Sequence, residues 1–205
     1  MKLYDGMGPN PAVVRMFIAE RGIGPIEVEK IDQRAGDNRR EPFLSKNPTG
    51  TVPALELDDG TILAEITALC EYLDEIGEGP SLIGETPAER AVTRMWTRRI
   101  DLKICEPLVS GWRYGPGEPM FRDRIRCLPE ASAGLLQLAH DGYAWLDGQM
   151  ADGRIYVAGD RLTLADILLF GFVEFGNMVG QPLGEENTHL HAWHGRMKAR
   201  PSAAA

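Results

Sequence analysis

The sequence predicts an α/β domain at the amino terminus followed by an all-α helical domain at the carboxy terminus. Residues 1–76 alternate strand-like and helix-like patterns, whereas the periodic segments after residue 86 have the spacing of helices. Between them, residues 77–84 are rich in Gly, Pro and Ser, which is typical of a break between domains. We therefore place the domains at residues 1–78 and 86–205, joined by a linker at 79–85.

The chain begins with a short strand and a helix. We assign Lys2–Asp5 to the strand and Gly6–Asn10, which is rich in turn residues, to the loop after it. Asn10 suits the N-cap of the helix, and Pro11 suits its first position because proline has a helical φ and no N–H. The helix is expected to end at Gly22.

A second strand is predicted at residues 26–31, where apolar and charged residues alternate. Ile26, Val28 and Ile31 are expected to face inward. The polar residues 32–40 predict a loop, and residues 41–46 predict a short helix. The order of strand, helix and strand indicates a right-handed βαβ unit.

The run from Asn47 to Ile66 has the features of a peptide-docking site. Pro53 cannot donate to a strand ladder, so it belongs at the first residue of a strand and leaves the backbone groups of Val52 free. If the Val52–Pro53 bond is cis, those groups point outward and an extended ligand can pair with them as an added strand. Asp58-Asp59-Gly60 then predicts a hairpin turn.

Glu65 stands at the start of a predicted helix that ends at Gly77. The apolar stripe of this helix comprises Ile66, Leu69, Cys70, Leu73 and Ile76. Backbone N–H groups at a helix N-terminus attract carboxylates. A peptide main chain at Val52 and its terminal carboxylate at the Glu65–Ile66 turn would therefore occupy one continuous site.

The helical domain is predicted to start at Thr86, with Pro87 in the first turn and Glu89 completing a capping box. Its first helix is expected to bury one apolar side, made of Ala91, Val92, Met95, Trp96, Ile100 and Cys105. After a Gly-Pro-Gly interruption, we expect helices at about residues 120–128 and 129–150. A second capping box, Thr163 with Asp166, precedes an apolar helix.

The run beginning Asn47, Pro48, Gly50, Val52, Pro53 and the Thr163 capping box resemble the glutathione transferases. The resemblance implies a thioredoxin-like amino-terminal domain, an all-helical carboxy-terminal domain, a homodimer and glutathione as co-substrate. It implies that Val52 and Pro53 hold the cysteinyl backbone and that Glu65 and Ile66 hold the γ-glutamyl end. The serine that this family carries after the Glu is Ile66 here, so one hydroxyl is missing.

The resemblance also places a thiol-activating group in the loop 6–10, where the family carries a Tyr or Ser hydroxyl or a Cys. This loop has no Ser, Thr or Cys, and Asn10 is its one side chain able to donate. Asn10 resembles the Asn of bacterial Nu-class transferases, which are associated with glutathione-dependent disulfide reduction. We take it as the catalytic candidate; the alternative is that it only caps its helix.

Two further parts of the site are less defined by the sequence. Arg40 is our candidate for the glycine carboxylate of glutathione, with the alternatives Arg34, Arg39 and Lys46 left open. Trp112 and Tyr114, beside the Gly-Pro-Gly loop, are candidate walls of an apolar pocket for the second substrate. Packing in the core is the alternative for both aromatic residues.

Composition limits the partners. A formal charge of −8 and a pI near 5.1 argue against nucleic acid and anionic membranes, which require a basic face. Three cysteines without a C-x-x-C pair argue against a disulfide framework. Without an apolar leader or an 18-residue apolar run, we expect a cytoplasmic protein. The histidines at 189–194 lack further ligands at metal spacing, and we assign no metal.

The function predicted from these residues is transfer of the glutathione thiolate to a small electrophile or a disulfide. The lack of a loop hydroxyl favours disulfide reduction. One alternative is a binding or assembly module that keeps the fold without the chemistry. Another is a glutathione-dependent isomerase or lyase.

Overall fold

The computed structural model describes all residues from Met1 to Ala205. The chain forms two compact units, one of Met1–Glu85 with Pro201–Ala205 and the other of Thr86–Arg200. The first unit is a mixed α/β domain and the second is helical, so the predicted fold class is confirmed.

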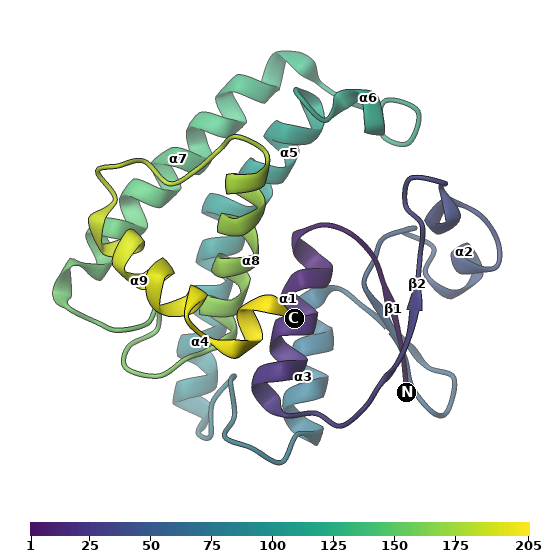
Figure 1. The fold of residues 1–205 in the computed structure, drawn as a ribbon, viewed down its shortest axis with the longest axis horizontal. Coiled ribbons are helices and arrows are strands. Elements are labelled where there is room, and N and C mark those ends of the chain that lie inside the picture. The colour runs from purple at the N-terminus through teal and green to yellow at the C-terminus, as the bar shows by residue number, and fades with distance from the viewer. The chain divides into compact units, whose positions relative to one another are not determined.

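A four-stranded sheet with the order β2-β1-β3-β4 organises the first unit (Figure 1). Strand β1 runs parallel to β2 and antiparallel to β3, and β3 runs antiparallel to β4. The elements of this unit are β1 (Lys2–Asp5), α1 (Pro9–Arg21), β2 (Glu27–Lys30), η1 (Asp37–Arg39), α2 (Phe43–Lys46), β3 (Ala54–Glu56), β4 (Ile62–Ala64), α3 (Ile66–Ile76) and the 3₁₀ helix η5 (Pro201–Ala204).

Both faces of the sheet carry helices. Helices α1 and α3 lie side by side on one face, and α2 lies on the opposite side (Figure 1). On the α2 side, Phe43 packs in a buried cluster with Tyr4, Ile31, Val52 and Ala54. This cluster fixes the start of β3, where Val52 lies, against the centre of the sheet.

Helix α1 begins earlier than predicted, at Pro9, with Gly8 as its N-cap. Gly8 has a φ of 108°, a conformation that glycine adopts without a steric penalty, and it makes no side-chain cap bond. Asn10 is therefore inside the first turn, so its prediction as the N-cap was wrong. Pro9 takes the first helical position that we assigned to Pro11.

Strand β2 is exposed along its whole length, and Val28 keeps 50% of its surface in solvent. The prediction that Val28 faces inward was wrong, whereas Ile26 is half-buried and Ile31, just after the strand, is buried as predicted. Strand β2 is the edge of the sheet, so it is paired on one side only and its faces are poorly covered. The alternation of apolar and charged residues shows a strand but does not show how well its apolar side is covered.

Helix α3 spans Ile66–Ile76 and is followed by Gly77, as predicted. The predicted hairpin is also confirmed, because β3 and β4 pair across Asp58-Asp59-Gly60. The carboxy-terminal residues, which the sequence analysis assigned to the helical domain, lie with the first unit. There, Ser202 donates a hydrogen bond to Glu20 of α1.

The second unit is helical throughout. Its elements are α4 (Pro87–Ile100), the π-helix η2 (Asp101–Cys105), α5 (Glu106–Tyr114), α6 (Glu118–Phe121), η3 (Pro129–Ala131), α7 (Ser132–Gln149), η4 (Met150–Asp152), α8 (Leu164–Met178) and α9 (Thr188–Lys198). The helix predicted at residues 120–128 was wrong beyond Phe121, and residues 129–131 form a 3₁₀ turn before α7. No helix combines the length and the apolar character needed to cross a membrane.

Both predicted capping boxes are present, at Thr86 with Glu89 and at Thr163 with Asp166. Asp166 is fully buried and accepts hydrogen bonds from the backbone of Val157 and Thr163 and from the Trp193 indole. These bonds join α8 to α9 and to the loop before α8. Burial raises the pKa of the Asp166 carboxyl above its ordinary value.

The exposed side of α4 differs from the prediction. Val92 and Met95, which we expected to be buried, keep 41% and 40% of their surface exposed, and Leu102 of η2 keeps 53%. Spacings of three and seven residues place these side chains near one face of the helix. The buried residues of α4 are Thr93, Trp96, Thr97 and Ile100.

Candidate functional site

Three strands of the sheet bring the sequence-predicted residues of the first unit to one end. Tyr4 pairs with Ala54, and Ala54 pairs with Ala64. In this register Gly6 lies two residues after Tyr4, Val52 two residues before Ala54, and Ile66 two residues after Ala64. The loop 6–10, the Val52 edge and the start of α3 therefore lie at the same end of the sheet.

Val52 has the geometry that the docking hypothesis requires. The Val52–Pro53 bond is cis. The side chain of Val52 is buried, but neither its N–H nor its C=O has a hydrogen-bond partner within the chain. An extended peptide that pairs with these two groups would satisfy both.

Glu65 is the one residue other than glycine with a positive φ, at 67° with a ψ of 121°. This conformation is rare for a residue with a Cβ and costs of order 1–3 kcal/mol. Glu65 occupies the N-cap of α3 without capping it, so the first N–H groups of α3, at Ile66 and Thr67, have no side-chain acceptor. The turn thus holds an exposed carboxylate side chain next to open backbone donors.

The loop after β1 is tightly packed at Gly6. A Cβ on Gly6 would lie 2.5 Å from Gln33 Oε1 and 2.8 Å from Val52 Cγ2, so only glycine fits between them. The loop therefore touches the Val52 edge directly.

Asn10 is placed to donate hydrogen bonds. Pro9 and Pro11 flank it, so among the first three residues of α1 only Asn10 has a backbone N–H. The Asn10 side chain is half-buried and has no hydrogen-bond partner. Its backbone and its carboxamide together supply the free donors at this helix N-terminus, where the helix dipole favours an anion.

Sequence reasoning missed Gln33, which follows β2. Its Oε1 accepts a hydrogen bond from the N–H of Met7 at 2.6 Å, a contact between residues 26 positions apart. No local pattern marks Gln33, since it lies in a polar loop among other charged and polar residues. Only the parallel pairing of β1 with β2 brings the two loops together.

The basic candidates have different surroundings. Arg40 donates to the carbonyls of Ala35 and Gly36 and pairs with Asp37 at 3.0 Å, while its side chain remains 62% exposed. Arg39 donates to the Thr49 carbonyl at 3.3 Å.

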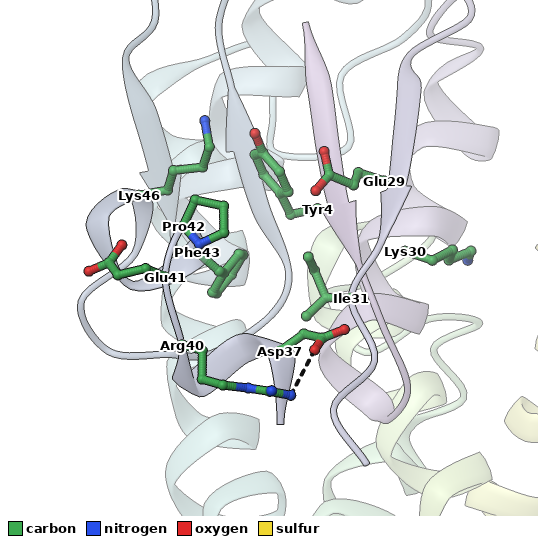
Figure 2. Close-up of a pocket in the computed structure, with 10 residues that line it drawn as sticks. All are labelled: Tyr4, Glu29, Lys30, Ile31, Asp37, Arg40, Glu41, Pro42, Phe43 and Lys46. Atoms are coloured by element: carbon green, nitrogen blue, oxygen red, sulfur yellow. Dashed lines mark hydrogen bonds and ion pairs between the residues drawn. The ribbon is translucent and has the colours of Figure 1, made fainter. Parts of the chain in front are cut away.

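Arg40 also lines a cavity of about 260 Å³ under α2, shown in Figure 2. Tyr4 and Phe43 meet edge-on in its wall, with ring centroids 5.8 Å apart. The Tyr4 hydroxyl donates to Glu56, and Lys46 pairs with the same carboxylate at 2.8 Å. Burial raises the pKa of Tyr4, and the hydrogen bond to Glu56 raises the pKa of Lys46. Tyr4 is thus a neutral core phenol whose hydroxyl is already engaged.

In the second unit, Trp112 lies in a cluster of aromatic rings. It meets Phe121 edge-on with centroids 5.7 Å apart and Phe175 with centroids 5.3 Å apart. Tyr114 is the last residue of α5 and is half-buried. Met178, one turn beyond Phe175 on α8, is 72% exposed. These edge-on contacts give Trp112 a role in packing α5 against α6 and α8.

Comparison with known proteins gives a consistent result. Residues 8–76 match the family model described as "Glutathione S-transferase, N-terminal domain", and residues 138–201 match "Glutathione S-transferase, C-terminal domain". The chain is 35% identical over 209 residues to "Glutathione S-transferase 2" of Saccharomyces cerevisiae, which covers 98% of this chain and 87% of the yeast protein.

Solved structures agree. The crystal structure of Gtt2 from Saccharomyces cerevisiae superposes with a TM-score of 0.91 at 35% identity, covering 100% of this chain and 99% of that chain. A glutathione S-transferase domain-containing protein from Marinobacter aquaeolei VT8 has a TM-score of 0.90 at 34% identity, covering 99% of this chain and 100% of that chain.

Proposed function

Because this chain belongs to the glutathione S-transferase family, we propose that it holds the thiol of glutathione as a thiolate beside Asn10 and transfers it to a small electrophile or a disulfide. Its similarity to glutathione transferases across almost the whole chain supports an enzyme of that kind.

The observation that carries this proposal is the unpaired backbone of Val52 at a cis-proline, at the same end of the sheet as the open N-terminus of α3 on the neighbouring strand. The cysteinyl main chain of glutathione would pair with Val52 and pack against Pro53. Its γ-glutamyl carboxylate would accept from the N–H of Ile66, and the Glu65 carboxylate would bind its ammonium group. Ile66 lacks the hydroxyl of the family pattern but retains the backbone donor.

Asn10 is the proposed thiolate-stabilising residue. A free thiol has a pKa of about 8.5, and lowering it by one or two units requires roughly 1.4–2.7 kcal/mol. The Asn10 N–H, its carboxamide and the positive end of α1 are together adequate for this, since a helix terminus supplies about 0.3–1 kcal/mol and a hydrogen bond to an anion about 1.5–3 kcal/mol. The position of Asn10 inside the first turn favours this role, because its carboxamide does not cap the helix and is free to bind the thiolate.

Arg40 is proposed for the glycine carboxylate. Its Nε and Nη2 are engaged with the loop, but its Nη1 has no partner and the side chain is exposed. The engaged atoms hold the guanidinium in place while the free edge remains available to a carboxylate.

Trp112 and Tyr114 are proposed to line the second-substrate pocket. We also propose a cytoplasmic homodimer. The exposed apolar side chains Val92, Met95 and Leu102 support the dimer because one helix face with three such residues favours burial against a second copy. The three unpaired cysteines support a reducing compartment.

Retention on immobilised glutathione tests the binding step. The chain should be retained, and millimolar glutathione should raise its melting temperature. Failure of both would overturn the proposal. Turnover of hydroxyethyl disulfide compared with chlorodinitrobenzene then tests the reaction, and we expect the disulfide to be preferred. Asn10→Ala should lower kcat by about tenfold or more; unchanged rates with both substrates would reject Asn10.

A second candidate is a glutathione-binding module without catalysis. Ile66 in place of a serine and the absence of a hydroxyl in the loop 6–10 favour it. It predicts glutathione binding without the ultraviolet absorbance of a thiolate. Absorbance near 240 nm in a titration of the complex with base separates the two candidates.

A further inference from the structure

Gln33 joins the two loops at the end of the sheet. Its Oε1 accepts the hydrogen bond from Met7, so the segment after β2 holds the loop that leads to Asn10. Gln33 Oε1 and Val52 Cγ2 both lie next to the Cβ position that Gly6 lacks, at 2.5 Å and 2.8 Å from it. Gln33 is therefore next to the proposed glutathione groove although it belongs to another loop.

The hydrogen bond to Met7 fixes which way the carboxamide faces. A backbone N–H is a donor only, so the atom that faces Met7 has to be the oxygen of Gln33. The amide is planar, and its NH₂ group is consequently held on the other side. This NH₂ group has no hydrogen-bond partner within the chain, and the side chain is half-buried.

A donor that is held in place without a partner is a feature of a binding site, because it can donate to a ligand oxygen without first losing a protein contact. Because the Gln33 carboxamide and the Val52 side chain meet at the Cβ position of Gly6, the free NH₂ group lies close to the Val52 edge, where the ligand main chain is proposed to lie. An extended tripeptide offers carbonyl and carboxylate oxygens there. Gln33 supplies a neutral donor that does not repel the tripeptide's ammonium group.

We propose that Gln33 is a glutathione-binding residue whose NH₂ group donates to an oxygen of the tripeptide main chain, while its Oε1 positions the loop that carries Asn10. This inference rests on the proposed function, since it needs glutathione to lie along Val52. It adds a residue that the motif-based choice of site residues did not contain.

Two substitutions separate the two atoms of the carboxamide. Gln33→Glu keeps an oxygen acceptor for the N–H of Met7 but loses the donor and places a carboxylate against the ligand oxygen. Its KM for glutathione should rise about tenfold or more, with kcat within about twofold of the wild type. Gln33→Leu removes both atoms, so it should raise KM and also shift the thiolate pKa upward.

Gln149→Glu is the matched control, because it makes the same charge change at an exposed position at the end of α7. Its KM and kcat should equal those of the wild type. Melting temperatures of all three variants monitor folding. A Gln33 that merely holds the loop predicts that Gln33→Glu behaves like the wild type, and that result would overturn the proposal.

Calorimetric titration with glutathione distinguishes the two levels of inference. If the wild type binds and Gln33→Glu binds equally tightly, the assignment of Gln33 fails alone. If the wild type does not bind, the proposed function fails and the assignment of Gln33 fails with it. Weakened binding by Gln33→Glu, with a normal melting temperature, supports both.

Discussion

The conformation of Glu65 leads to a prediction in which stability and function change in opposite directions. The residue has a φ of 67° and a ψ of 121°, and its exposed side chain makes no hydrogen bond or ion pair within the chain. Replacing it by glycine relieves the backbone strain, whereas replacing it by alanine retains the strain and removes only the carboxylate. The pair of variants therefore separates the cost of the backbone from the use of the side chain.

The expected magnitudes follow from these two differences. A strained backbone of this kind costs of order 1–3 kcal/mol, and glycine gives back roughly 0.5–1 kcal/mol through the greater entropy of the unfolded chain. Glu65→Gly should therefore raise the free energy of unfolding by about 0.5–2 kcal/mol. Glu65→Ala should change it by less than about 0.5 kcal/mol, because an exposed side chain without partners contributes little.

Thermal unfolding without ligand measures the first effect, and about 1 kcal/mol corresponds to roughly 2–4 °C in Tm for a chain of this length. Titration with glutathione measures the second, and both variants should bind more weakly because each lacks the carboxylate proposed to bind the ligand's ammonium group. Equal melting temperatures for Glu65→Gly and Glu65→Ala would refute the strain argument. Undiminished affinity in both would refute the role of the side chain.

Three further predictions concern the rest of the chain. Arg21 is buried, and its Nε lies 3.0 Å from Oδ1 of Asp74. Arg21→Met should lower the free energy of unfolding, measured in urea, by about 3–5 kcal/mol because it leaves the carboxylate of Asp74 without its charged partner. The hydrogen bond from Arg154 lowers the pKa of Asp152 to about 2, below its value in the unfolded chain. The ionised Asp152 therefore stabilises the fold above about pH 4, and this stabilisation is lost as the pH falls toward 2. The difference in Tm between Asp152→Asn and the wild type should close over that interval. Met95→Glu should convert the proposed dimer to a monomer in light scattering.

Each of these has a control at an exposed position. Arg34→Met should leave the free energy of unfolding within about 0.5 kcal/mol of the wild type. If Arg21→Met lowered it by no more than that, the buried pair of Arg21 and Asp74 would contribute nothing beyond an exposed arginine. Asp160→Asn, at an exposed position, should leave the free energy of unfolding at neutral pH within about 0.5 kcal/mol of the wild type. Met178→Glu should remain dimeric; a monomer there as well would reject α4 as the interface.

The elements predicted correctly are those whose chemistry is local. Each capping box lies within four residues, so Thr86 and Thr163 identify their helices without any knowledge of the tertiary structure. The predicted start of α1 was wrong because both Pro9 and Pro11 suit the first turn of a helix. The backbone of Gly8 decides between them, because it adopts a positive φ that cannot be predicted from the pattern of side chains.

Burial was predicted less well than helicity, because it depends on neighbours that are distant in sequence. The apolar spacing of Val92 and Met95 indicated a helix face, and α4 does present them on one face. That face is exposed, since the helix packs through Trp96 and Ile100 instead. A periodic pattern shows which residues share a side, whereas the topology decides which side is covered.

The candidate site divides along the same line. Val52, Pro53, Glu65 and Ile66 come from one continuous run of the sequence, and their proposed contacts use mainly backbone groups fixed by a cis-proline and a helix N-terminus. A main-chain site tolerates a change such as serine to Ile66 because the N–H remains. The proposed thiol end is different, because it depends on the side chains of Asn10 and Gln33, whose two loops are joined by the hydrogen bond from Met7 to Gln33. The proposed recognition of glutathione can therefore be predicted from one segment, whereas the proposed chemistry of its thiol depends on how the loops after β1 and β2 meet.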